Sequence, residues 1–126
     1  MPFPLFLHRL LTFGRRSEIQ AIDFLRTLGF RIVTSGYRDK AGEIDVIAWE
    51  DDVLVFIEVK ARRNAEPPED AVGLRKQQRM IRAAKSYLTK HHLEDAQYRF
   101  DILAVSALAG STAEFRLLRD AFNMYN

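Results

Sequence analysis

The chain contains no cysteine among its 126 residues. This absence excludes a disulfide framework, a thiol nucleophile and any cysteine-ligated zinc or iron–sulfur site. Long apolar runs are also absent, and none approaches the length that a membrane span requires. We therefore expect a cytoplasmic protein without a membrane segment.

The N-terminal segment is apolar but does not have the order of a signal peptide. A signal peptide carries its positive charge first, followed by an unbroken apolar run and a small-residue cleavage site. Here His8 and Arg9 interrupt the apolar run, and Arg15 and Arg16 come after it. We expect residues 1–16 to form a lead-in helix that caps the core, with a helix lying on a membrane surface as the alternative.

Positive charge is concentrated in one part of the chain. Residues 60–92 contain nine Lys or Arg residues and three acids, an excess of six positive charges. Because the whole chain has a net charge of +2, the remainder carries −4. Such a segment suits an anionic partner such as nucleic acid, although excess charge alone also serves solubility.

The length is that of one domain, and a hydrophobic content of 48% is enough for one core. Periodicity and turn residues predict helices at 18–28 and 71–89, strands at 30–34, 43–49, 53–59, 98–108 and 114–118, and loops at 35–41 and 64–70. We expect a single α/β domain spanning residues 1–126, with helices packed on a mixed sheet.

One predicted hairpin gathers ionisable side chains. If Asp51 and Asp52 form a two-residue turn, Asp45 lies opposite Glu58 on the neighbouring strand. Side chains alternate between the two faces of a strand. The same face would therefore carry Glu43, Asp45, Glu58 and Lys60.

Like charges directly opposite each other destabilise a sheet, so this group needs a compensating cation. Oxygen ligands without Cys or a nearby His favour Mg²⁺ or Mn²⁺ over zinc. The alternative is a solvated outer face of a two-sided hairpin. Against it, residues 53–59 (VLVFIEV) are apolar on both faces, as in a strand covered from both sides.

Gly42-Glu43-Ile44-Asp45, followed by residues 55–62 (VFIEVKAR), resembles the signature of the YraN-like family of uncharacterised, endonuclease-like bacterial proteins. That family belongs to the PD-(D/E)xK nuclease superfamily and is similar to archaeal Holliday-junction resolvases. The resemblance runs from about Arg16 to Phe122, with Lys76 in the second helix and Arg99-Phe100-Asp101 in the later strand. It implies a restriction-endonuclease-like α/β/α core, a central mixed sheet flanked by helices.

The resemblance also implies roles for individual residues. Asp45 and Glu58 would ligate Mg²⁺ or Mn²⁺ together with the Val59 carbonyl, and Glu18 would complete the shell directly or through water. Lys60 would orient or help to deprotonate the attacking water. Asp45, Glu58, Lys60 and Glu18 are the expected catalytic residues. Glu43 is expected to support the site without ligating the metal.

The second predicted helix has two faces. Met80, Ala84, Tyr87 and Leu88 share one, and Arg75, Arg79 and Arg82 share the opposite one. The expected nucleic-acid contacts are Arg62, Lys76, Gln77 and Arg79. Gln77 has a structural alternative, as a polar residue at a helix edge, and Asp101 is either a metal ligand or an ion-pair partner.

We expect a metal-dependent nuclease that hydrolyses phosphodiester bonds in DNA, with branched or recombination intermediates as candidate substrates by resemblance. The alternative is a non-catalytic nucleic-acid-binding module with a nuclease-like fold. A third hypothesis is an interaction subunit whose apolar N-terminal helix docks a partner. Resolvase-like relatives often dimerise, so a homodimer stays open.

Overall fold

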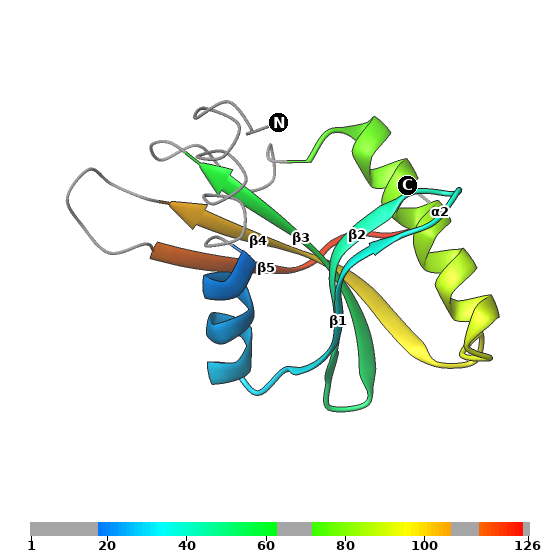
Figure 1. Ribbon diagram of the computed structural model, residues 1–126, viewed down its shortest axis with the longest axis horizontal. Coiled ribbons are helices and arrows are strands. Elements are labelled where there is room, and N and C mark those ends of the chain that lie inside the picture. The colour runs from blue at the N-terminus through cyan, green and yellow to red at the C-terminus, as the bar shows by residue number, and fades with distance from the viewer. Residues whose placement is uncertain (1–17, 63–71, 107–113, 125–126) are drawn as a thin grey trace, which may run out of the picture.

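A computed structural model describes residues 18–62, 72–106 and 114–124 (Figure 1). Within these ranges the chain forms a helix at residues 18–27, the α-helix α2 and five strands. The expected lead-in helix at 1–16 and the expected loop at 64–70 lie outside the described residues. The order of elements, helix, three strands, helix and two strands, is the predicted one.

The five strands form one mixed sheet in the order β1-β2-β3-β4-β5. Their bounds are β1 Arg31–Arg38, β2 Glu43–Glu50, β3 Val53–Arg62, β4 Gln97–Ser106 and β5 Glu114–Phe122. β3 and β4 pair in parallel, whereas the other neighbours are antiparallel. A parallel pair needs a crossover connection, and α2 (Leu74–Lys90) lies in that connection between β3 and β4.

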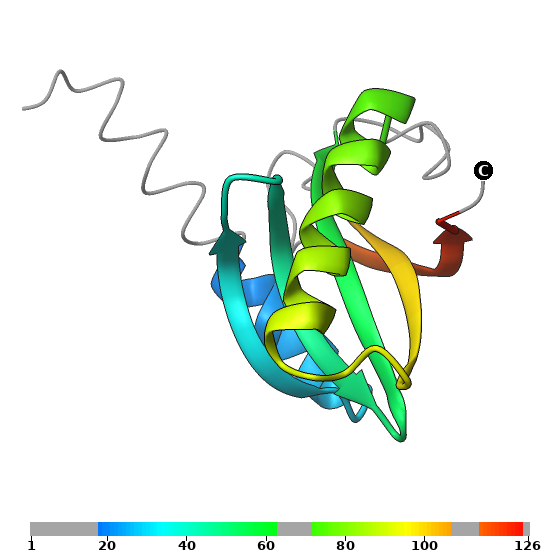
Figure 2. The same cartoon turned by 90° about the vertical axis from the view of Figure 1, so that its right-hand side faces the viewer.

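Each face of the sheet is covered by one helix, which gives three layers (Figures 1 and 2). On one side, Met80, Ala84 and Leu88 of α2 pack with Phe56 and Phe100 of the sheet. On the other side, Ala21 and Leu25 of the N-terminal helix pack with Val55, Ile57 and Leu103. The α/β fold with a mixed sheet is therefore confirmed, and so are the predicted faces of α2, because Arg75, Arg79 and Arg82 are exposed.

The register predicted for the β2–β3 hairpin is confirmed over its paired part. Glu50 pairs with Val53 across the Asp51-Asp52 turn, and the ladder continues to Val46 and Ile57. Asp51 adopts a left-handed conformation with φ 52°, which a short polar residue in a tight turn tolerates.

Three predicted strands extend further along the chain by three or four residues, and one of them is β3, which ends at Arg62 and not at Val59. β1 continues to Arg38, through residues expected to be loop, because Gly36 supplies a φ of 66° within the strand. β5 continues to Phe122, past the predicted end at Leu118. Two large apolar residues of the predicted helix 18–28 are not buried, since Ile19 and Leu28 are 60% and 40% exposed.

Among the described residues, neither helix has the length and apolar character needed to cross a bilayer.

Candidate functional site

The carboxylate of Asp45 lies where the pairing of β2 and β3 ends. Backbone pairing stops at Val46 and Ile57, one residue before the expected Asp45–Glu58 pair. Beyond that point the Val59 N–H donates to Asp45 Oδ2 at 2.8 Å. A side chain therefore replaces the backbone acceptor that a continuing ladder would have supplied, and Asp45 is held between the two strands.

Glu58 is the second carboxylate of this site and is buried. Its side chain is 10% exposed, and Oε2 has no hydrogen-bond partner. Burial, followed by the neighbouring Asp45 carboxylate, raises the pKa of Glu58 to about 8. A buried acid beside a second acid resists ionisation unless a cation compensates.

A cation does reach the pair, and it comes from α2. Lys76 Nζ lies 3.7 Å from Glu58 Oε1 and 3.1 Å from Glu43 Oε1. Although burial opposes it, Glu58 and Glu43 raise the pKa of Lys76. Glu43 Oε2 in turn accepts a hydrogen bond from Arg38 at 2.9 Å, and the bonds from Lys76 and Arg38 lower the pKa of Glu43. The expected grouping of Glu43 with the two central acids is therefore present.

The sequence did not identify Lys76 as the cation of this cluster. Lys60 was expected to lie with the carboxylates on this face. Its side chain is exposed, and among the described residues Lys76 is the cation that forms an ion pair with Glu58. The missed signal is the position of Lys76 in the first turn of the helix that follows the E-x-K strand. A crossover from β3 to a parallel neighbour returns the helix over the sheet, so its residues reach the face of β3.

Glu18, in the first turn of the N-terminal helix, lies near Gly36 of β1. A Cβ placed on Gly36 would be 3.9 Å from Glu18 Oε1. Gly36 lies between Ser35 and Tyr37, which pair with Val46 and Ile44, so it faces Asp45 across the two strands. Even so, no three acidic or histidine side chains of the described residues are grouped closely enough to hold a metal by themselves.

Three further residues, Gln77, Arg79 and Arg62, were predicted to contact nucleic acid. Gln77 Nε2 donates to the Val72 carbonyl at 3.0 Å, which is the partner that a polar side chain at this helix edge requires. Arg79 is exposed. The side chain of Arg62 lies outside the described residues.

Asp101 has the contacts of an ion-pair partner. It is fully buried, and Arg99 Nε and a terminal nitrogen of Arg99 donate to its two oxygens at 2.8 and 2.9 Å. The Asp120 N–H adds a third hydrogen bond at 2.9 Å. Of its two interpretations, the ion pair is the one that the contacts support.

Comparison with known proteins gives a family. Residues 17–105 match the model of "Uncharacterised protein family UPF0102". The chain belongs to the UPF0102 family. The match covers the carboxylate hairpin and α2 together, and it agrees with the YraN-like family that the motifs resemble.

Individual UPF0102 relatives align over nearly their whole length. A UPF0102 protein from Desulforapulum autotrophicum is 41% identical over 111 residues, covering 86% of this chain and 91% of the relative. One from Lachnoclostridium phytofermentans is 38% identical over 115 residues, covering 89% and 93%. One from Geotalea daltonii is 37% identical over 115 residues, covering 90% and 91%.

The donor set of this UPF0102 chain fits a hard divalent cation. Glu58 Oε2 is a buried oxygen without a hydrogen-bond partner. Asp45 accepts from the Val59 N–H through Oδ2, so its other oxygen, Oδ1, could ligate a cation. Two carboxylates and a backbone carbonyl are all oxygen donors, and Mg²⁺ keeps several waters when a protein supplies few ligands. Asp45, Glu58 and the Val59 carbonyl are thus the residues that could hold Mg²⁺ or Mn²⁺.

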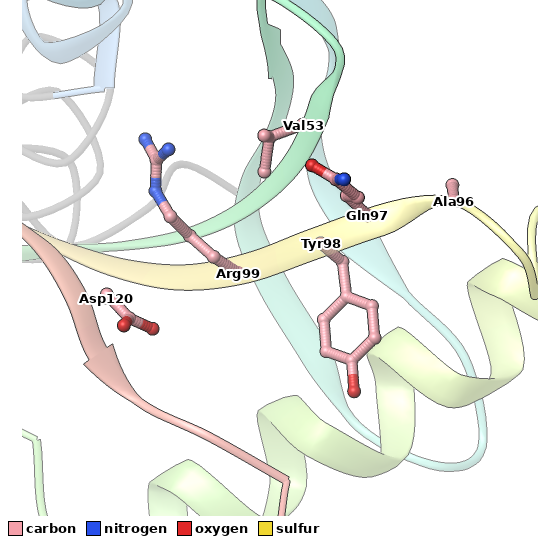
Figure 3. Close-up of a pocket in the computed structure, with 6 residues that line it drawn as sticks. All are labelled: Val53, Ala96, Gln97, Tyr98, Arg99 and Asp120. Atoms are coloured by element: carbon pink, nitrogen blue, oxygen red, sulfur yellow. The ribbon is translucent and has the colours of Figure 1, made fainter.

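A hollow of about 490 Å³ lies at the other end of the parallel strands, where β3 and β4 begin (Figure 3). There Tyr98 points toward α2 and Arg99 to the other side of β4. Arg99 is already bound by Asp101 and Glu50. Ligands of open α/β sheets bind at the carboxyl ends of parallel strands, and Glu58 lies toward that end of β3. The carboxylate site is accordingly the stronger candidate.

Proposed function

We propose that this protein is a metal-dependent nuclease that hydrolyses phosphodiester bonds in DNA, with a restriction-endonuclease-like core of the PD-(D/E)xK superfamily. The observation that carries the proposal is the buried Glu58 carboxyl group, with one oxygen unbonded, beside Asp45 at the opened end of a hairpin. Two neighbouring buried acids destabilise the fold. A site that binds a divalent cation explains why both are present.

Asp45, Glu58 and the Val59 carbonyl would hold Mg²⁺ or Mn²⁺. The ion supplies a water that ionises near neutral pH and positive charge for the phosphate oxygens. Asp45 is oriented by the Val59 N–H, and Glu18 completes the shell through water. Lys60, exposed at the end of the E-x-K strand, orients the attacking water and offsets phosphate charge. Lys76 keeps the acids charge-balanced before substrate arrives, and Arg79 contributes to the phosphate path.

The test is cleavage of end-labelled linear, flapped and four-way DNA by the full chain with Mg²⁺, Mn²⁺ or EDTA. We expect cleavage that requires metal and falls by about 100-fold or more in Asp45→Asn, since the amide keeps the oxygen that accepts from Val59 but loses the charge. Asp52→Asn is the matched control, because it makes the same change in the exposed hairpin turn.

Other outcomes separate the alternatives. Cleavage that survives EDTA, or an Asp45→Asn variant as active as Asp52→Asn, contradicts the proposal. Salt-sensitive DNA binding by wild type without any cleavage would instead identify a non-catalytic nucleic-acid-binding module. Preference among the three substrates decides whether branched DNA is the target.

A further inference from the structure

A basic pocket lies beside the carboxylate site, between the β1–β2 turn and α2. It has a volume of about 460 Å³. Six ionisable side chains line it: Arg38, Asp39, Lys40, Glu43, Arg79 and Arg82. Four of these are cations and two are acids, so the pocket has an excess of positive charge.

Both acids of the pocket already accept hydrogen bonds from other groups of the protein. Asp39 Oδ1 accepts from the N–H groups of Ala41 and Gly42 at 2.8 and 3.2 Å, and Oδ2 accepts from the Tyr37 hydroxyl at 2.9 Å. Hydrogen bonds from Ser86 first, then from Tyr37 and the turn, hold the pKa of Asp39 well below its usual range. The two oxygens of Glu43 are bound by Lys76 and Arg38.

Two cations of the pocket are available to a ligand. Lys40 and Arg79 are exposed, and in the part of the chain that the structure describes no carboxylate lies within ion-pair distance of either. An anion would meet these two charges without breaking an existing ion pair.

The turn between β1 and β2 packs directly against α2 (Figure 1). A Cβ on Gly42 would overlap the Arg79 carbonyl oxygen, so only glycine allows the turn to lie this close to the helix. Arg82 Nε also donates to the Ala41 carbonyl at 3.4 Å. The pocket is therefore preformed, which lowers the entropic cost of binding.

Glu43 connects the pocket to the carboxylate site, since it lines the pocket and shares Lys76 with Glu58. We propose that Lys40 and Arg79 bind a non-reacting backbone phosphate of the nucleic-acid strand whose scissile phosphate lies at Asp45 and Glu58. This subsite rests on the proposed nuclease function, and phosphate contacts of this kind position a strand without reading its sequence.

The test compares two double variants that remove the same charge. Lys40→Gln/Arg79→Gln changes the pocket, and Arg75→Gln/Lys85→Gln changes exposed cations elsewhere on α2. DNA affinity is measured by fluorescence anisotropy with Ca²⁺ at several salt concentrations. We expect the pocket variant to bind about tenfold more weakly and to lower the salt slope by about one to two, with a much smaller change in the control. In cleavage, KM rises and kcat is retained.

Equal effects of the two double variants overturn the subsite but leave a nuclease that cleaves intact. A wild-type chain that neither binds nor cleaves DNA overturns both. Titration with inorganic phosphate is the second arm. If phosphate binds wild type but not the pocket variant, while both bind DNA equally, the pocket serves a free anion and the strand subsite is wrong.

Discussion

Glu58 combines burial with an ionisable group, and the combination should be visible in stability. A carboxyl group whose pKa is about 8 when folded and near 4.5 when unfolded binds its proton more tightly in the native state. Its stabilising contribution is therefore complete below about pH 4.5 and is lost as pH rises toward 8. Retaining a group that opposes folding at neutral pH is typical of a functional site.

Glu58→Gln should remove the loss of stability that occurs as pH rises toward 8. In EDTA at pH 8.5 we expect the variant to unfold with a free energy about 1–2 kcal/mol above that of wild type, because an ionising buried carboxyl is replaced by a neutral amide. At pH 4.5 the gain should vanish. Urea denaturation at both pH values is the measurement, with the exposed Glu94→Gln as control. A variant no more stable than wild type at pH 8.5 would show that the native fold tolerates the Glu58 charge.

At the scale of elements, a second charge network joins three strands at the other end of the sheet. Glu50, near the end of β2, binds Arg119 of β5 at 2.8 Å and also Arg99 of β4, which holds Asp101. Hydrogen bonds from Arg119 first, then from Arg99, lower the pKa of Glu50 to about 2 despite burial. This network connects the hairpin to β4 and β5, and we assign it to the fold.

Glu50→Gln should therefore make the protein less stable at neutral pH and less sensitive to acid. A depressed native pKa stabilises above the unfolded value near 4.5, and that contribution disappears as pH falls toward 2. We expect a loss of about 1–2 kcal/mol at pH 7 that becomes much smaller as pH falls toward 2. Chemical denaturation across this range is the test, with exposed Glu114→Gln as control. A loss that is the same at every pH would mean that packing, not charge, is responsible.

At the scale of the whole molecule, the sheet separates two cores that share its strands. Consecutive residues of β3, such as Phe56 and Ile57, belong to opposite cores. Neither core can lose its sheet face without disrupting the other, so we expect the described layers to unfold together.

Leu25→Ala tests this coupling. Trp49, the only tryptophan, packs against the core under α2, whereas Leu25 belongs to the core on the opposite face of the sheet. We expect a loss of about 2–4 kcal/mol and an equal shift of the midpoints from Trp49 fluorescence and from circular dichroism. Met80→Ala on the other face should behave alike, whereas Leu74→Ala, 60% exposed, should cost little. A Trp49 transition that stays in place in Leu25→Ala would show that the two cores unfold separately.

Much of the site could be predicted because its spacing is local. The two-residue turn at Asp51-Asp52 fixes the register up to Val46 and Ile57, and strand alternation then brings Asp45 and Glu58 together. The α2 faces follow from helical periodicity in the same way. These features depend only on neighbours a few residues apart, so the chain itself determines them.

Only the tertiary structure decided which cation pairs with the site carboxylates and which groups pack around the charged residues. Lys76, not Lys60, reaches Glu58, because the crossover from β3 places the first turn of α2 over the sheet. Only glycine fits at position 42 because the Arg79 carbonyl of α2 lies against it, and Asp101 accepts a hydrogen bond from the Asp120 N–H of β5. Local sequence sets the strands and their faces, whereas contacts between distant segments depend on how the layers close, which no short spacing encodes.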